Sequence, residues 1–263
     1  LGSFAMASGA SALNNLSLRT AGTRVLTATD GGGGGPALAA GVSGGLTLNH
    51  NNPTRLRVLT PLETRVPGST GNGRTGSAYT TLAGVSFNAI VDLTDGFWNL
   101  TPGASQEIRL VADDPFAVIV PTTQVVTTSA TFGVTMLRAG STLLRAEMVN
   151  VIPVFGPVVA QDTATAVNVL PGTPSRLLVK LPGETFDQGS PTGKVGSAIA
   201  QQAGANFSIQ VGVVDSYFNI VTGRAADVKI LTPSDAFGLF VSTVGINTLA
   251  GITPPILVTL KRA

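Results

Sequence analysis

Hydrophobic and polar residues alternate in short runs along most of this chain. The alternation is clearest over residues 87–93, 107–111, 132–136 and 207–211. A period of two predicts β-strands with one buried face, because successive side chains of a strand point to opposite sides of the sheet. No segment carries a sustained apolar stripe with the period of a helix. The pattern therefore predicts an all-β protein.

Turn-forming residues separate these runs. Clusters of Gly, Pro, Asn, Asp and Ser occupy residues 67–73, 94–96, 102–103 and 171–174. These residue types favour turns, since they tolerate or stabilise the backbone conformations that turns need. About seven short strands per hundred residues, with a turn every 8–12 residues, are typical of an antiparallel β-sandwich.

A block of about forty residues occurs twice, at an offset of 121 residues (55 to 176) that becomes 120 after a one-residue deletion. The first copy begins Arg-Leu-Arg-Val-Leu-Thr-Pro-Leu-Glu-Thr, and the second begins Arg-Leu-Leu-Val-Lys-Leu-Pro-Gly-Glu-Thr. Further along, Asp-Gly-Phe-Trp-Asn at 95–99 matches Asp-Ser-Tyr-Phe-Asn at 215–219. A fixed period with preserved order predicts tandem copies of one structural unit. A third, partial copy lies at the front, where residues 16–28 match residues 134–146.

Composition narrows the possible partners. Only 11% of residues are charged and the net charge is +2. No run of Lys and Arg with interleaved aromatic residues is present, so we do not expect a nucleic-acid partner. The chain has no cysteine, which excludes disulfides and thiolate metal sites. Residues 236–260 are uncharged, but a Pro-Pro pair and several Gly and Asn residues argue against a membrane-spanning helix.

The second copy contains four motifs: Leu-Pro-Gly-Glu-Thr at 181–185, a Gly-rich loop with Lys194, Ala-Gly-x-x-Phe at 203–207 and Asp-x-Tyr-x-Asn at 215–219. In this order they resemble the bacterial immunoglobulin-like repeats of very large secreted or surface-bound proteins. Leu62 departs from the pattern, which has Gly there. The resemblance implies tandem immunoglobulin-like antiparallel β-sandwiches and an extracellular or cell-surface location. We expect terminal strands of a partial unit plus a Gly-rich linker in 1–45, a full domain in 46–150, a linker in 151–165, and a domain lacking its last strand in 166–263.

No set of acid, base and nucleophile is apparent, so we do not expect an enzyme or a cofactor. His50 is the only histidine and lies in a polar connector. Asp113 and Asp114 favour a turn, and a structural calcium site that could include Asp92 and Asp95 stays open. The aromatic pairs at 97–98 and 217–218, like Phe87 and Phe207, are expected in the sandwich cores. A sugar-stacking platform at these pairs is the alternative.

These features favour a structural role, as a subunit or segment of a surface fibre or filament. An adhesin-type module that recognises carbohydrate or a host surface is the alternative. The matched front segment predicts a candidate inter-subunit strand that would complete another copy, giving a head-to-tail homopolymer. The other interpretation is that the chain is a window on a longer array. The residues of the candidate strand are Gly22, Thr23, Arg24, Val25, Leu26, Thr27 and Ala28.

Overall fold

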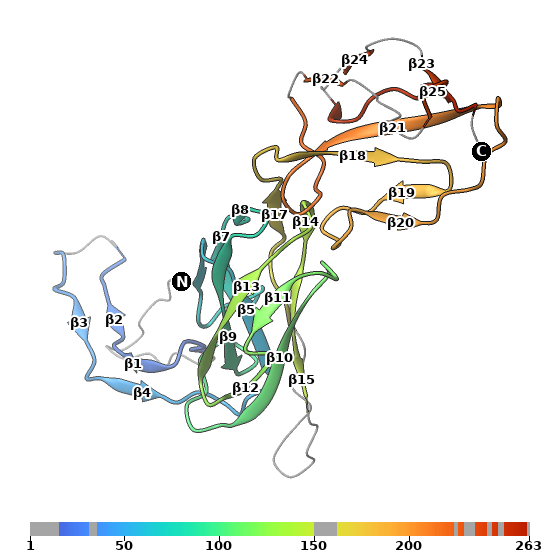
Figure 1. Ribbon diagram of the computed structural model, residues 1–263. Helices are drawn as coiled ribbons and strands as arrows, with labels where there is room; N and C mark the ends of the chain where they lie inside the picture. The colour runs from blue at the N-terminus through green and yellow to red at the C-terminus, as the bar shows by residue number, and fades with distance from the viewer. Residues whose placement is uncertain are drawn as a thin grey trace.

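The computed structural model describes residues 16–31, 36–149, 162–223, 226–228, 235–240, 244–246 and 250–261. No α-helix occurs in these ranges, and the strands pair antiparallel except for one parallel pair. The described residues thus include no helix that could cross a membrane. Figure 1 shows two strand-rich bodies in succession, with a separate hairpin of β1–β4 beside the first. The predicted all-β class is confirmed.

The first body is a sandwich of two four-stranded sheets. Their strand orders are β5-β9-β13-β11 and β12-β10-β15-β16. This is the immunoglobulin-like arrangement, in which strands A, B, E and D face strands C, F and G. The bounds are β5 (Arg55–Leu59), β9 (Ser86–Thr94), β10 (Gln106–Ala112), β11 (Val118–Val120), β12 (Thr123–Val126), β13 (Ser129–Thr135), β15 (Leu144–Met148) and β16 (Asp162–Thr163).

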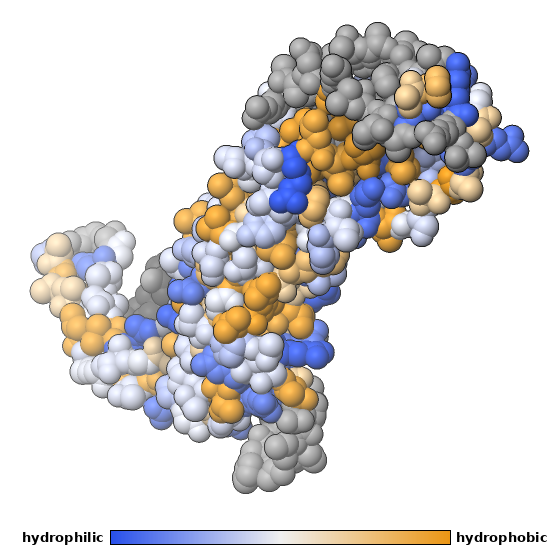
Figure 2. Space-filling view, viewed as in Figure 1, coloured by the Kyte–Doolittle hydropathy of each residue, from blue (hydrophilic) through white to orange (hydrophobic). Residues whose placement is uncertain are grey.

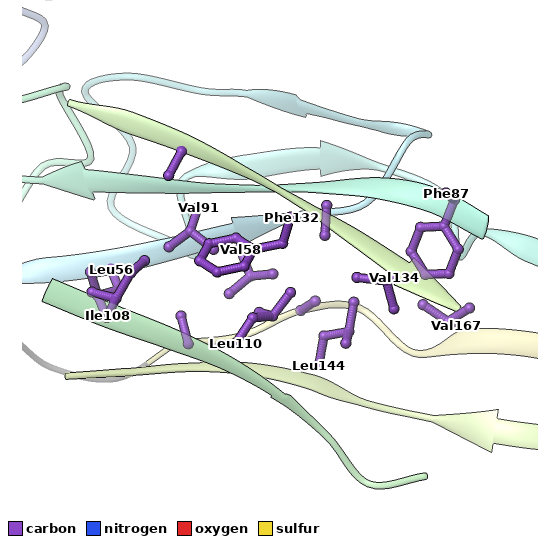
Figure 3. Close-up of a cluster of buried hydrophobic side chains, with 14 of the residues drawn as sticks. Leu56, Val58, Phe87, Val91, Ile108, Leu110, Phe132, Val134, Leu144 and Val167 are labelled. Atoms are coloured by element: carbon purple, nitrogen blue, oxygen red, sulfur yellow. The ribbon is translucent and has the colours of Figure 1, made fainter. Parts of the chain in front are cut away.

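The core of the first sandwich lies between its two sheets (Figure 3). Alternation places every second side chain of β9 inward, so Phe87, Ala89, Val91 and Leu93 are all buried there. Ile108 of β10 meets them from the facing sheet. Each large apolar side chain removed from water in this way stabilises the fold by roughly 1.5–3 kcal/mol.

Two paired segments complete this sandwich, and we call residues 140–149 together with 162–170 the closing hairpin. Its first strand comprises β14 (Gly140–Thr142) and β15, and its second comprises β16 and β17 (Val167–Leu170). β15 pairs with β10, while β17 pairs in parallel with β8 (Thr80–Leu82). Residues 151–161 of the linker predicted over 151–165 lie outside the described ranges. β16 and β17, at the end of that linker and the start of the domain predicted from 166, pair with strands of the first sandwich. Alternation marks strands but does not reveal which sheet they join.

The second body repeats much of the first. Its main sheet has the order β18-β21-β25-β23, and β22 pairs with β24. Phe207 of β21 faces Val258 of β25 as Phe87 faces Val134 in the first sandwich. Among the described residues, its buried core comprises Ile209, Val211, Val213, Val228, Ile256 and Val258. The bounds are β18 (Arg176–Lys180), β21 (Asn206–Val214), β22 (Ala226–Val228), β23 (Leu239–Phe240), β24 (Val244–Ile246) and β25 (Ile256–Thr259).

The remaining strands are short ladders. β6 pairs with β7 in the first body and β19 with β20 in the second. β1 pairs with β4 and β2 with β3 at the front of the chain. The expected start of a domain at residue 46 therefore falls on the first residue of β4, which pairs with β1. The bounds are β1 (Gly22–Arg24), β2 (Thr27–Ala28), β3 (Gly41–Val42), β4 (Leu46–Leu48), β6 (Glu63–Arg65), β7 (Arg74–Gly76), β19 (Glu184–Phe186) and β20 (Lys194–Gly196).

Candidate assembly interface

Residues 22–31 and 36–48 pair as a hairpin, the front hairpin, that repeats the closing hairpin pair for pair. β1 pairs with β4 and β2 with β3, as β14 pairs with β17 and β15 with β16. The first strands are offset by 118 residues (22 to 140) and the second strands by 121 (48 to 169), and every paired residue matches. The predicted inter-subunit strand, Gly22–Ala28, thus pairs with residues 41–48 of its own chain. Figure 1 shows this hairpin projecting from the first sandwich.

The closing hairpin buries the face of β5 in the first sandwich. Leu56 and Val58 of β5 are both 0% exposed. They share the core with Leu144 and Ala146 of β15 and with Val167 of β17. A hairpin of this kind therefore supplies both the edge strand and a layer of core side chains.

Within the described residues, nothing plays this part in the second sandwich. Leu177 and Val179 of β18 hold the positions of Leu56 and Val58, yet they are 50% and 40% exposed. Figure 2 shows apolar residues gathered on the visible face of this body, beside β18 and β21. An apolar sheet face left in water is a marker of an interaction surface.

A hollow of about 290 Å³ opens beside this face in the second sandwich. Ile199, Ala203, Phe207 and Leu260 line it together with Leu181. Phe207 is consequently only half-buried, whereas the equivalent Phe87 is buried. The expectation that both rings would be buried is wrong for Phe207. The Phe87 ring lies 5.0 Å from that of Tyr79 and shares its buried cluster with Val167 of the closing hairpin. The second sandwich has Ile199 in place of Tyr79 and, among the described residues, no counterpart of that hairpin.

The rim of this hollow lacks a strand that the first sandwich has. β8 is a strand there because β17 pairs with it. The equivalent residues 200–202 are not in a strand and are exposed. Their main-chain groups lack the parallel partner that β17 provides, so this rim resembles an open sheet edge.

In each body, one loop binds the base of the hairpin that precedes that body. We call these loops, residues 95–99 and 215–219, the junction loops. At the second junction, the Asn219 side chain accepts a hydrogen bond from the Ala139 N–H at 2.8 Å. It also donates to the Leu137 carbonyl oxygen at 2.8 Å. Asp215 holds the loop by accepting hydrogen bonds from the Asn219 main chain and side chain. The base of the closing hairpin is therefore fixed on the second body.

The first junction has the same hydrogen bonds. Asn99 accepts from the Ala21 N–H at 2.9 Å and donates to the Arg19 carbonyl oxygen at 2.8 Å. Asp95 accepts from the Asn99 N–H and side-chain amide. Burial acts to raise the pKa of Asp95, but its hydrogen bonds with Asn51, Asn99 and the loop amides outweigh this and lower the pKa. The front hairpin thus sits on the first body as the closing hairpin sits on the second.

The second aromatic residue of each junction loop, Trp98 or Phe218, lies outside the hydrophobic clusters between the sheets, contrary to expectation. Trp98 and Phe218 both adopt φ of 63° and cover glycines of the preceding Gly-rich loop, where a Cβ on Gly73 would lie 2.3 Å from the Trp98 ring. Arg55 lies 4.9 Å over the Trp98 ring, and Arg176 lies 4.6 Å over Phe218. Since Trp98 is only 6% exposed, it offers no open face on which a sugar could stack.

The preceding aromatic residue of the second junction loop crosses to the other body. Tyr217 packs against the core of the first sandwich. A Cβ on Gly84 would lie 2.1 Å from the Tyr217 ring, so only glycine permits this contact. The equivalent Gly204 has the same backbone conformation, with φ of 82° against 81°, and nothing lies within 4 Å of its Cβ position. The equivalent of Tyr217 is Phe97, whose ring lies under the Arg19 guanidinium at 5.6 Å.

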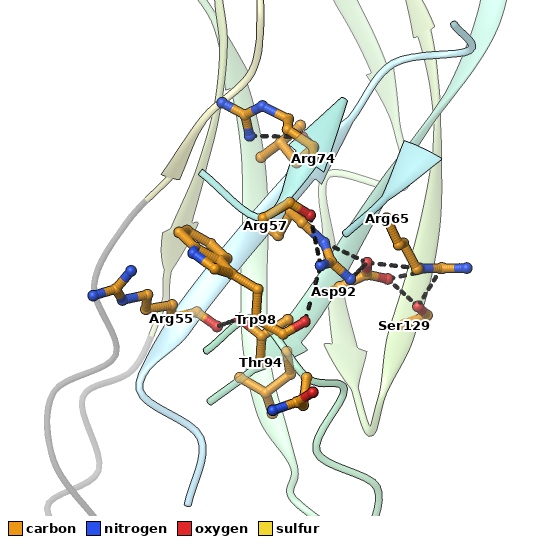
Figure 4. Close-up of polar contacts among 12 residues, drawn as sticks. Arg55, Arg57, Arg65, Arg74, Asp92, Thr94, Trp98 and Ser129 are labelled. Atoms are coloured by element: carbon orange, nitrogen blue, oxygen red, sulfur yellow. Dashed lines mark hydrogen bonds and ion pairs between the residues drawn. The ribbon is translucent and has the colours of Figure 1, made fainter. Parts of the chain in front are cut away.

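A buried ionic network lies in the first body near its junction loop (Figure 4). Arg57 and Asp92 are both fully buried and pair at 2.6 Å, and Arg65 binds the second oxygen of Asp92 at 2.9 Å. Arg57 also donates to the Trp98 carbonyl oxygen at 3.0 Å, and Ser129 donates to Asp92. Burial acts to raise the pKa of Asp92, but these hydrogen bonds outweigh it and lower the pKa.

The second body fills the same position with apolar groups. Leu178, Phe186 and Gly212 replace the arginines and the aspartate of the first body. A Cβ on Gly212 would lie 3.3 Å from the Phe186 ring and 3.1 Å from Ile220. A charged cluster and an apolar cluster thus occupy equivalent places in one fold.

The carboxylates considered as calcium ligands are already paired in other ways. Asp113 forms an ion pair with Arg145. Asp114 accepts a hydrogen bond from the Leu137 main chain at 2.7 Å. His50 Nδ1 lies 2.9 Å from the carbonyl oxygen of the next residue. Across the described ranges, no three His, Asp or Glu side chains come together as a metal-binding group.

Comparison with known proteins identifies no sequence family. No family model and no curated protein matches the chain. Among solved structures, FdeC, an adhesin of Escherichia coli, is 13% identical over 86% of this chain and 62% of that chain, with a TM-score of 0.36. Domains 1–6 of the surface layer protein SbsC are 13% identical over 91% of this chain and 25% of that chain, with a TM-score of 0.30. The chain therefore spans less than two thirds of either protein, and the similarity extends no further than the all-β architecture.

Proposed function

We propose that this chain is a structural segment of an extracellular fibre or filament, in which successive copies join by strand complementation. The front hairpin of one copy, with its strand Gly22–Ala28, would complete the second sandwich of another copy. The second sandwich would thereby gain the strands that β15–β17 supply to the first.

The observation that carries this proposal is the match between two incomplete parts. The front hairpin has the pairing of the closing hairpin, but it closes no sandwich within the described residues. The second sandwich exposes Leu177 and Val179 where a hairpin would cover them. The front hairpin exposes Val25, Leu26 and Leu46. Covering both sets removes apolar surface from water and pairs an open edge.

The contact would be heterologous, because donor and acceptor lie at different ends of the chain. Heterologous contacts that do not close into a ring propagate as filaments. The two junctions within the chain support a regular repeat, since the front hairpin and the closing hairpin are held by the same hydrogen bonds.

Removal of the donor tests this proposal. We expect the native chain to form regular multimers in negative-stain images and in light scattering. A variant lacking residues 1–30 loses the first strand of the front hairpin and should remain a monomer with a less stable second sandwich. A control lacking only residues 1–15 keeps the hairpin and should still assemble. A native chain that stays monomeric at high concentration, or a 1–30 deletion that still polymerises, would falsify the proposal.

The alternative, an adhesin-type module, stays a prediction. It requires a ligand-binding surface on one body, and Trp98 is covered by Arg55 rather than free for a sugar. Binding to carbohydrate arrays by the monomeric deletion variant would favour this alternative, because assembly would then not be needed for function.

A further inference from the structure

We propose that the hollow beside Phe207 is a specific receptor for Leu46 and Leu48 of a second copy, and that Phe97 of that copy seals the contact by covering Gly204. This inference rests on the proposed function.

The first sandwich contains the same contact in assembled form. Val167 and Val169 of β17 belong to the same buried cluster as Phe87, and Figure 3 shows Val167 next to the Phe87 ring. The register pairs Asn168 with Thr80, so the strand runs parallel along β8. These two valines occupy the place that is hollow in the second sandwich.

The front hairpin presents leucines at the matching positions. Leu46 and Leu48 correspond to Val167 and Val169, because β1 faces β4 as β14 faces β17. The side chain of Leu46 is 45% exposed. Each leucine is one methylene larger than the valine it replaces. The hollow has room for the larger leucines, because Ile199 lines it where the first sandwich has the bulkier Tyr79. Volume-conserving exchanges of this kind keep a core well packed.

The junction loops supply a second, independent contact. Tyr217 is carried by the loop that holds the closing hairpin, and it packs on Gly84 of the body that this hairpin completes. Phe97 is carried by the equivalent loop, which holds the front hairpin through Asn99. If the front hairpin enters the second sandwich of another copy in the same register, Phe97 arrives at Gly204. The open space above Gly204 fits this occupant.

A disulfide trap tests the register. The chain has no cysteine, so no native thiol can compete with an introduced cysteine pair for disulfide formation. We would mix a T47C chain with an A200C chain, because these residues match Asn168 and Thr80 of the first sandwich. Register partners in a sheet lie within the Cα separation that a disulfide spans. We expect a cross-linked dimer that reducing agent dissolves. A mixture of T47C with S197C lies three residues off register and should cross-link at least tenfold less.

Two substitutions test the contacts, each with a matched control. Leu46→Asp should weaken assembly at least tenfold, whereas Thr47→Asp, on the exposed face of the same strand, should not. Gly204→Ala should also weaken assembly. Gly223→Ala carries the same backbone strain, with φ of 79° and open space, and should assemble like the native chain. The four variants should unfold within a few degrees of the native chain when dilute.

The outcomes separate this inference from the proposed function. If L46D and G204A still form multimers, and T47C and A200C chains never cross-link, the fibre proposal stands but the hollow is not the receptor for Leu46 and Leu48. A chain that never assembles would overturn both. If a thiol reagent cannot modify A200C in the monomer, the hollow is already occupied by part of the same chain. That result would overturn a second copy as the partner.

Discussion

Leu56 and Leu177 hold the same position in two copies of one sandwich, yet Leu56 is fully buried and Leu177 is half exposed. The difference does not arise in their own strands, because β5 and β18 pair with β9 and β21 in the same way. It arises because the closing hairpin covers one strand and no described residue covers the other. The repeat therefore contains both a closed and an open form of one fold.

The ionic network of the first body should depend on all its members. We expect Asp92→Ala to destabilise the first body by about 3–5 kcal/mol, because it leaves Arg57 buried without its carboxylate. The triple variant R57L/R65F/D92G introduces the residues of the second body and should cost much less. Chemical denaturation of both variants checks this. Equal losses would show that the apolar cluster cannot substitute for the charged one.

Stability should fall in acid. The pKa values of Asp92 and Asp95 are lowered in the folded state. Their contribution is therefore complete above the unfolded pKa of about 4 and is lost as the pH falls below it. We expect a melting temperature that is nearly constant from about pH 5 to 7 and declines below about pH 4. The triple variant lacks Asp92, so its decline should be shallower; an unchanged decline would remove Asp92 as a cause.

The asparagines of the junction loops should fix the bodies relative to their hairpins. Asn219→Ala removes the hydrogen bonds to Leu137 and Ala139 and should cost roughly 1–3 kcal/mol, since the main-chain groups are left unpaired. Small-angle scattering should show a wider range of inter-body arrangements. Asn168→Ala, on an exposed face of β17, is the control and should change neither measurement.

Gly84 and Gly204 allow a comparison of strain with packing. Alanine at either position costs about 1 kcal/mol or more, because φ is positive at both. Gly84→Ala must also displace the Tyr217 ring and should lose roughly a further 1–3 kcal/mol. Thermal unfolding of dilute, monomeric samples measures the difference. Equal destabilisation would mean that Tyr217 can move aside without cost.

Much of the fold was legible in local pattern. Alternation over 87–93 and 207–211 predicted β9 and β21, and the structure extends each by only a few residues. The repeat predicted that Phe87 and Phe207 would be equivalent, and their strand partners agree. The match of residues 16–28 with 134–146 predicted a front strand of the same type as that over 140–146, but not its pairing with residues 41–48. These features depend only on neighbouring or regularly spaced residues, so they can be predicted from the sequence alone.

The candidate interface depended on contacts that no local pattern encodes. The Asp-x-aromatic-x-Asn motif was visible twice, but its asparagines bind residues 80 and 82 positions away, and only the folded chain brings them together. A similar distance separates β8 from β17. By itself, the sequence determined which residues form strands and which face of each strand is apolar. Tertiary structure decided what covers that face, because burial and edge pairing depend on the approach of segments that are remote in the chain.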